Sequence, residues 1–143
     1  MKARKSLLNE NQARRLEITL YLVELSLDEI AGYLHGQIQS GEMYVTIRDL
    51  SDSQREKLLE VIGQVKREIA SIRDQFGLDK RVNDVKGLIM GHFSSMWESL
   101  HNARPRNLGG FGDVAPELFE NLDPAILQTI KILGRMPDIL SRG

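Results

Sequence analysis

Proline is absent from residues 1–104 of this 143-residue chain, and all four prolines lie beyond that point. Because proline lacks a backbone donor and clashes with the preceding turn, it disfavours a helix interior by about 3 kcal/mol. Residues 1–104 can therefore carry long helices, whereas residues 105–143 must be built from short ones. The prolines that impose this division are Pro105, Pro116, Pro124 and Pro137.

The first apolar repeat predicts a helix over residues 11–34. Its apolar residues return at alternating steps of four and three, which places them on one side of a helix. Ile18, Leu22 and Leu25 form a second apolar strip on another side. A helix with two apolar faces either lies at the centre of its bundle or is shared with a second subunit. The main stripe comprises Leu16, Leu20, Val23, Leu27, Ile30 and Leu34.

A second helix is predicted to begin after Ser51 and to end at Gly77. Ser51 and Ser53 each precede a glutamine or glutamate by three residues, which is the spacing of a capping box. Gly77 followed by Leu78 is typical of a Schellman ending, with glycine in the left-handed region and leucine folded back. Between these signals the repeat returns at Leu58, Ile62, Val65, Ile69, Ile72 and Phe76.

A third helix is predicted over residues 80–102, because Pro105 forbids its continuation. Gly87 and Gly91 lie one turn apart and remove side-chain bulk from one strip, which favours close approach of another helix. The predicted apolar face comprises Val82, Val85, Leu88, Ile89, Phe93, Met96, Trp97 and Leu100.

Residues 105–143 are expected to form short helices and a glycine- and proline-rich turn that pack on the bundle. Pro116 would open one helix, and Asp123 would cap another whose first residue is Pro124. The pattern predicts an all-α protein: an up-and-down helical bundle of three long helices plus short C-terminal helices. We expect one domain over residues 1–143, with residues 1–10 mobile. The short last helix cannot cover the long ones, so open apolar surface favours a homodimer.

Composition narrows the class of protein further. The 19 basic and 20 acidic residues give a net charge of −1, which offers no strong attraction to nucleic acid or anionic lipid. There are no cysteines, which excludes disulfides and thiolate zinc sites. No apolar run is long enough for a membrane span, and the basic residues Lys2, Arg4 and Lys5 lack interleaved aromatic residues. We therefore expect a cytoplasmic protein that does not bind membranes, and binding of nucleic acid through the basic N-terminus, which also includes Arg14 and Arg15, is the weakest of the hypotheses.

The connection over residues 37–50 is longer than a helix hairpin needs. Within it, Met43, Val45 and Ile47 alternate with Tyr44 and Thr46, a period of two that is typical of extended backbone. Two interpretations remain open. The segment is either an arm that adds a strand to a partner or to its own copy, or a loop that covers the end of the bundle. In the first case Met43, Tyr44 and Val45 are the residues that bind the partner.

A row of acidic residues on the first helix offers a candidate metal site. Glu24 and Asp28 lie one turn apart, and Glu98-x-x-His101 on the third helix has the spacing of ferritin-like di-metal sites. Carboxylates and an imidazole that meet inside a bundle would suit iron or manganese. Such sites use two Glu-x-x-His pairs, and only one is present here, so a solvated acidic face is the competing interpretation. The row comprises Glu17, Tyr21, Glu24, Asp28 and His35.

Three glycines within four residues follow two arginines in the segment 104–112. Arg104 and Arg106 could hold a phosphate or carboxylate, and the glycines permit unusual backbone angles. Phe111, between two of these glycines, could be an exposed anchor for a partner. The competing interpretation is a tight turn that redirects the chain after the third helix.

These patterns favour a non-enzymatic module for protein interaction or regulation, which pairs with itself and binds another protein. The chain contains no nucleophile elbow and no phosphate-binding loop, and we expect no cofactor. The alternative is a metal-dependent protein or enzyme that uses Glu24, Asp28, Glu98 and His101.

Overall fold

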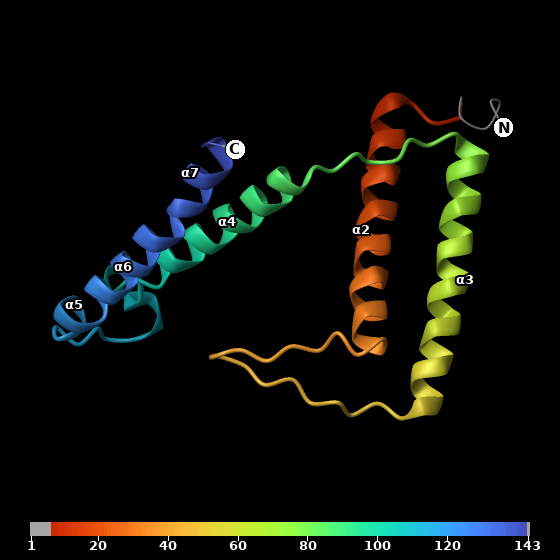
Figure 1. Ribbon diagram of the computed structural model, residues 1–143. Helices are drawn as coiled ribbons and strands as arrows, with labels where there is room; N and C mark the ends of the chain where they lie inside the picture. The colour runs from red at the N-terminus through yellow and green to blue at the C-terminus, as the bar shows by residue number, and fades with distance from the viewer. Residues whose placement is uncertain (1–6, 143) are drawn as a thin grey trace. The chain divides into compact units, whose positions relative to one another are not determined.

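The structure is a computed structural model that describes residues 7–142 (Figure 1). Within these residues the chain is all-α and contains no strand, so the predicted fold class is confirmed. Three helices are long, and the C-terminal helices bend at Gly134. The elements are α2 (Glu10–Leu34), α3 (Asp52–Phe76), α4 (Val85–Asn102), the 3₁₀ helices η1 (Pro105–Asn107) and η2 (Gly109–Phe111), α5 (Leu118–Asn121), α6 (Asp123–Leu133) and α7 (Arg135–Arg142).

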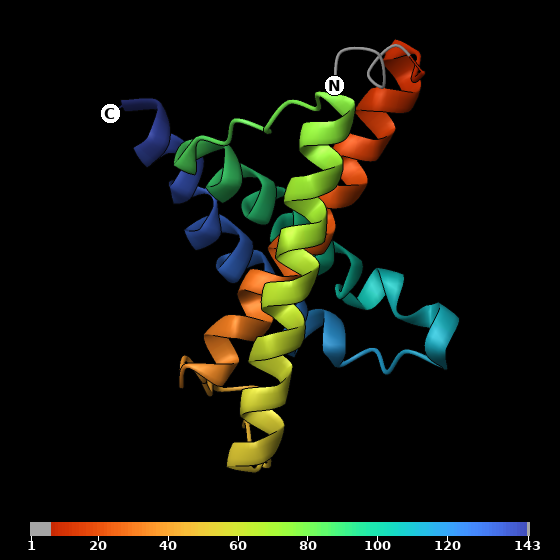
Figure 2. The same cartoon turned by 90° about the vertical axis from the view of Figure 1, so that its right-hand side faces the viewer.

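The chain divides into two compact units between Arg81 and Val82. The first unit contains α2 and α3, which lie side by side and antiparallel (Figures 1 and 2). In the second unit α4 packs against α6 and α7. The predicted assembly of all these helices into one bundle and one domain stays a prediction. None of the described helices is long and apolar enough to cross a membrane.

The beginning of α2 is set by a reciprocal cap. Asn9 Oδ1 accepts the N–H of Gln12 at 2.8 Å, and Gln12 Oε1 accepts the N–H of Asn9 at 3.0 Å. The helix therefore starts at Glu10, one residue before the predicted position, and it ends at Leu34 as predicted. Of the residues 1–10 predicted to be mobile, residues 1–6 lie outside the described residues, Lys2, Arg4 and Lys5 among them.

Both predicted ends of α3 are confirmed. Ser51 Oγ accepts the N–H of Gln54 at 3.1 Å, and Gln54 Oε1 accepts the N–H of Ser51 at 2.9 Å. At the other end Gly77 has φ 60° and ψ 40°, which is the left-handed region. Leu78 donates its N–H to the C=O of Arg73 at 3.0 Å, and its side chain is buried. This six-to-one bond with a buried leucine is the Schellman ending.

The beginning of α4 differs from the prediction by five residues. The Asp84 carboxylate accepts the N–H of Gly87 at 2.6 Å and so starts the helix at Val85. Val82 precedes the helix and is 93% exposed, so its predicted place on an apolar helix face is wrong. Gly87 serves this cap, because a Cβ there would lie 2.8 Å from Asp84 Oδ1. A Cβ at Gly91 would meet nothing within 4 Å, so none of the described residues makes the close approach predicted for these glycines.

The apolar stripes of the long helices are only partly covered. Among the described residues, the buried hydrophobic side chains of the core are those of Leu34, Ile62 and Leu78. Leu22 and Leu25, from the second strip of α2, are 54% and 49% exposed. In its own unit α2 has one long neighbour, α3. Because a single neighbouring helix covers only one side of α2, the second strip stays exposed.

An ion pair joins the end of α4 to the beginning of α6. Arg104 Nε donates to Asp123 Oδ1 at 2.8 Å, and Arg104 Nη2 donates to Asp123 Oδ2 at 3.1 Å. The hydrogen bonds from Arg104 lower the pKa of the Asp123 carboxyl, against the opposing effect of desolvation. The prediction that Asp123 caps α6 is wrong, because its carboxylate is engaged by Arg104, and no side chain caps this helix.

Gly77→Ala should lower the free energy of unfolding by about 1 kcal/mol, because alanine is strained at a positive φ. Gly63→Ala is the matched control, since Gly63 lies inside α3 and a Cβ there would meet Arg67 Nη1 at an ordinary 3.5 Å. This control should raise the free energy of unfolding by about 0.5–1 kcal/mol. Urea denaturation followed by circular dichroism measures both. Changes of the same sign would contradict the left-handed ending of α3.

Asp123→Asn should lower the urea midpoint of the full chain at about pH 7 and should change it less at an acidic pH below the usual pKa of aspartate. The pKa of Asp123 is lowered from its usual 3.8, so the ionised pair stabilises the folded state above that pH. The stabilisation is lost as the pH falls through the lowered pKa. Asp113→Asn removes an exposed carboxylate of the same unit and serves as the control. An equal effect of Asp123→Asn at both pH values would contradict a role for the ionised pair.

Candidate functional site

The connection between α2 and α3, residues 35–51, is called the arm. It contains neither helix nor strand, and Figure 1 shows it extending away from the ends of both helices. Met43 is 93% exposed, Val45 81% and Ile47 76%. Within the first unit these three side chains therefore do not cover the ends of α2 and α3, and the arm projects away from this pair of helices (Figure 1). Its role in binding a partner stays a prediction.

Two hydrogen bonds within the arm hold its turn. Gly41 donates its N–H to the C=O of Tyr44 at 3.0 Å, and Thr46 donates its N–H to Ser40 Oγ at 3.1 Å. A Cβ at residue 41 would lie 2.7 Å from Tyr44 Cε1, so a side chain there would require the tyrosine ring to move. The arm thus turns back on itself through its own contacts.

These two bonds define an inner and an outer edge of the arm. In extended backbone the N–H and C=O of one residue point to the same edge, and those of the next residue point to the opposite edge. Tyr44 and Thr46 use their backbone groups on the inner edge. In extended backbone this alternation would place the backbone groups of Val45 and Ile47 on the outer edge, whereas Met43 lies in the bend at residues 42–43.

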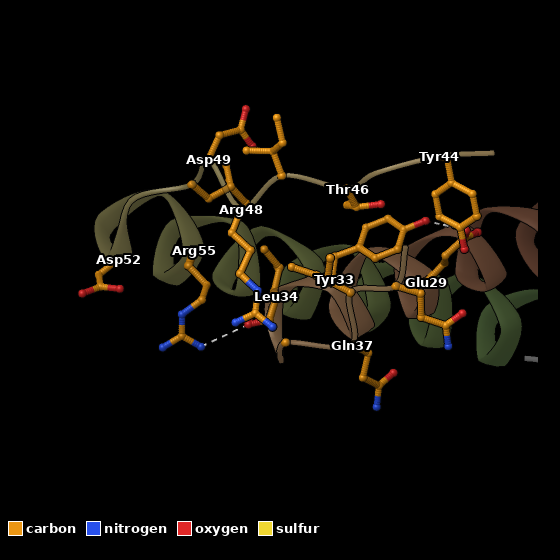
Figure 3. A pocket seen from close by; sticks show the side chains of 15 residues that line it. Glu29, Tyr33, Leu34, Gln37, Tyr44, Thr46, Arg48, Asp49, Asp52 and Arg55 are labelled. Carbon is orange, nitrogen blue, oxygen red and sulfur yellow. Dashed lines mark hydrogen bonds between the residues drawn. The ribbon is translucent and has the colours of Figure 1, made fainter. Parts of the chain in front are cut away.

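A hollow of about 800 Å³ lies at the base of the arm (Figure 3). Tyr33 Oη donates to the Glu29 carboxylate at 2.6 Å, and this hydrogen bond raises the pKa of Tyr33. Arg55 Nη1 donates to the C=O of Leu34 at 3.3 Å. It brings a positive charge to the end of α2, whose last turn has no basic residue. The arm contributes Tyr44, Thr46, Ile47, Arg48, Asp49 and Leu50 to this hollow.

The acidic row of α2 faces α3 and the segment that follows it. Glu17 accepts the backbone N–H of Asp79 at 2.6 Å. The Asp28 carboxylate accepts a hydrogen bond from Lys66, which raises the pKa of that lysine. One turn after Glu17, the guanidinium of Arg81 lies 5.0 Å from the centre of the Tyr21 ring. The row therefore aligns α3 and its C-terminal extension against α2.

The predicted metal ligands do not form a cluster in the part of the chain that the structure describes. No group of three or more histidine, aspartate or glutamate side chains there could hold a metal ion. Glu24 and Asp28 belong to the first unit, with Asp28 engaged by Lys66. Glu98 and His101 belong to the second unit, where the His101 ring lies 4.1 Å from the Trp97 ring.

The predicted anion site is partly occupied by the chain itself. Arg104 binds the Asp123 carboxylate, whereas Arg106 is exposed and only adds to the positive charge that lowers the pKa of Asp123. The glycine-rich segment forms the tight turn through η1 and η2, and Gly112 has φ 141°, which favours glycine. Phe111 is 91% exposed, as expected of an anchor, and its binding role stays a prediction.

The described residues form no cluster that could hold a metal ion, so excess Mn²⁺ or Fe²⁺ should leave the Tm of the full chain unchanged. A metal that bound the folded state would raise the Tm. Asp28→Asn should lower the free energy of unfolding by at most about 0.5 kcal/mol, since the pair with Lys66 is largely exposed. Glu60→Gln, an exposed change on α3, is the control. A metal-dependent rise in Tm that Asp28→Asn abolishes would instead support the metal site.

Comparison of the chain with protein families, with curated proteins and with solved structures finds no match. Neither a family nor a relative therefore indicates an activity. The function must be inferred from the geometry, exposure and charge of the described residues.

Proposed function

We propose that this chain is a non-enzymatic protein-interaction module, and that residues 43–47 bind as an added β-strand along an exposed sheet edge of a partner protein. The observation that carries this proposal is the exposure of Met43, Val45 and Ile47 on an arm without secondary structure. In strand addition, main-chain hydrogen bonds supply affinity and alternate side chains enter pockets that give specificity. An alternating apolar segment with an open backbone edge meets both requirements.

The backbone of the arm supports this mode of binding. Among the described residues, Thr46 is the one residue between 43 and 50 whose N–H donates within the chain, and it does so on the inner edge. The N–H groups of Val45 and Ile47 donate to no described group, and in extended backbone they would lie on the edge opposite that of Thr46. An unpaired edge of this kind is a template for pairing with another strand.

The side chains of the arm support the same conclusion. Single exposed hydrophobic residues are common on protein surfaces, whereas aligned series mark binding surfaces. Met43, Val45 and Ile47 would lie on one face of an added strand, because side chains alternate with a period of two. Burial of a methylene group contributes about 0.8 kcal/mol, so the three side chains together could supply several kcal/mol. Part of this gain offsets the entropy lost when the arm is ordered.

The hollow at the base of the arm gives a partner a second place to dock. It adjoins residues 44–50, so a chain bound along the arm would reach it. Tyr33, Tyr44, Arg48 and Arg55 line it, and tyrosine and arginine are enriched at protein interfaces. Figure 3 shows these side chains arranged around the end of α2.

Photo-crosslinking in cells tests the location of the surface. A benzophenone amino acid at residue 45 should capture one discrete protein, whereas the same group at residue 61 should not. Val61 is 52% exposed on α3 and lies outside the arm. Absence of a captured protein at residue 45, or equal capture from both positions, would contradict the arm as the binding surface.

Binding of the purified captured protein to the full chain then tests the mode. Val45→Pro should weaken binding by about tenfold, because proline removes an outer-edge N–H that strand addition requires. Val45→Thr keeps the N–H and the β-branched shape and is the matched control, for which we expect a much smaller effect. Binding that tolerates proline at residue 45 would contradict strand addition.

A further inference from the structure

The second strip of α2, Ile18, Leu22 and Leu25, lies roughly opposite the side that meets α3. At 3.6 residues per turn these residues share one side of the helix, whereas Leu20, Leu27 and Asp28 lie on the other side. Their exposed fractions are 36% for Ile18, 54% for Leu22 and 49% for Leu25. The strip is therefore an apolar surface that the first unit leaves uncovered.

The strip carries opposite charges at its two ends. Arg14 lies four residues before Ile18, and Glu29 lies four residues after Leu25, so both continue the same line along the helix. Both residues are exposed. Glu29 accepts a hydrogen bond from Tyr33 through one carboxylate oxygen, which leaves it able to accept a second donor.

This order of residues is self-complementary when it is reversed. If a second α2 runs antiparallel across the strip, Leu22 meets the partner subunit's Leu22 near the two-fold axis. Ile18 then lies opposite the partner's Leu25, and Arg14 lies opposite the partner's Glu29. A parallel arrangement would place arginine against arginine and glutamate against glutamate, which is unfavourable.

We propose that two copies of this chain associate through an antiparallel α2–α2 seam made by Arg14, Ile18, Leu22, Leu25 and Glu29. The occupant is a second copy because the strip matches itself in both hydrophobicity and charge under a two-fold rotation, as an isologous interface requires. The seam leaves the pairing of α2 with α3 intact and does not use the arm, and it shares only Glu29 with the hollow at the base of the arm. From Arg14 to Glu29 the seam is about 22 Å long, at a rise of about 1.5 Å per residue. A single short helix face buries little area, so we expect a reversible dimer and not an obligate one.

Sedimentation equilibrium of the full chain and its charge-reversal variants tests the seam. Arg14→Glu and Glu29→Arg should each weaken dimerisation by about tenfold, and the combination should restore it. In a parallel seam each reversal would replace one like-charged contact by another, so neither single change would weaken the dimer. Single variants without effect, or a double variant that is not restored, would overturn the antiparallel register.

Substitution of the central leucine tests the location of the interface. Leu22→Glu should make the chain monomeric, whereas Val61→Glu, at a similarly exposed apolar residue of α3, should not. Because the chain has no cysteine, Leu22→Cys introduces a unique thiol, which should form a disulfide-linked dimer under mild oxidation. A monomeric wild-type chain at high micromolar concentration, or a dimer that persists in Leu22→Glu with its helical circular dichroism intact, would overturn the proposal.

Discussion

The distribution of apolar residues around α2 determines which of its sides α3 can cover and which stay exposed. This helix carries a main stripe, an acidic row and a second strip on different sides, and its own unit gives it one long neighbour. The pairing with α3 engages the adjacent row through Glu17 and Asp28 and covers the main stripe only in part, because Val23 and Ile30 stay 40% and 39% exposed. It cannot also cover the opposite side. The exposed second strip therefore follows from the sequence pattern together with the pairing of α2 and α3.

Polar contacts determine how the helices are positioned more than how stable they are. The pair of Asp28 and Lys66 is largely exposed, and pairs of this kind contribute little net free energy. The pair of Arg104 and Asp123 is better protected and bidentate, and it fixes where α6 begins relative to the end of α4. Both join residues far apart in the sequence and so select one alignment of neighbouring helices among several that hydrophobicity alone would permit.

The parts of the fold that could be predicted are those determined by local chemistry. The cap at Ser51 and the left-handed Gly77 depend on residues a few positions apart, and both are confirmed. The extended character of the arm also follows from its period of two, although its projection away from the helices does not.

The parts that could not be predicted depend on contacts between distant residues. Asp123 has the sequence context of a helix cap, but Arg104, nineteen residues earlier, engages its carboxylate. Asp28 has the context of a metal ligand, but Lys66 binds it from a different helix. Residue spacing on one helix does not reveal such partners. The beginning of α4 is a partial exception, because Asp84 is itself a recognisable cap residue.

We propose two binding surfaces on this chain, the arm for a partner protein and the exposed side of α2 for a second copy. Methyl NMR of the full chain over a dilution series tests whether another copy covers that side of α2. We expect concentration-dependent shifts at Ile18, Leu22 and Leu25, while the resonances of Val61 stay constant. Methyl resonances of the strip that do not change across the whole series would contradict it.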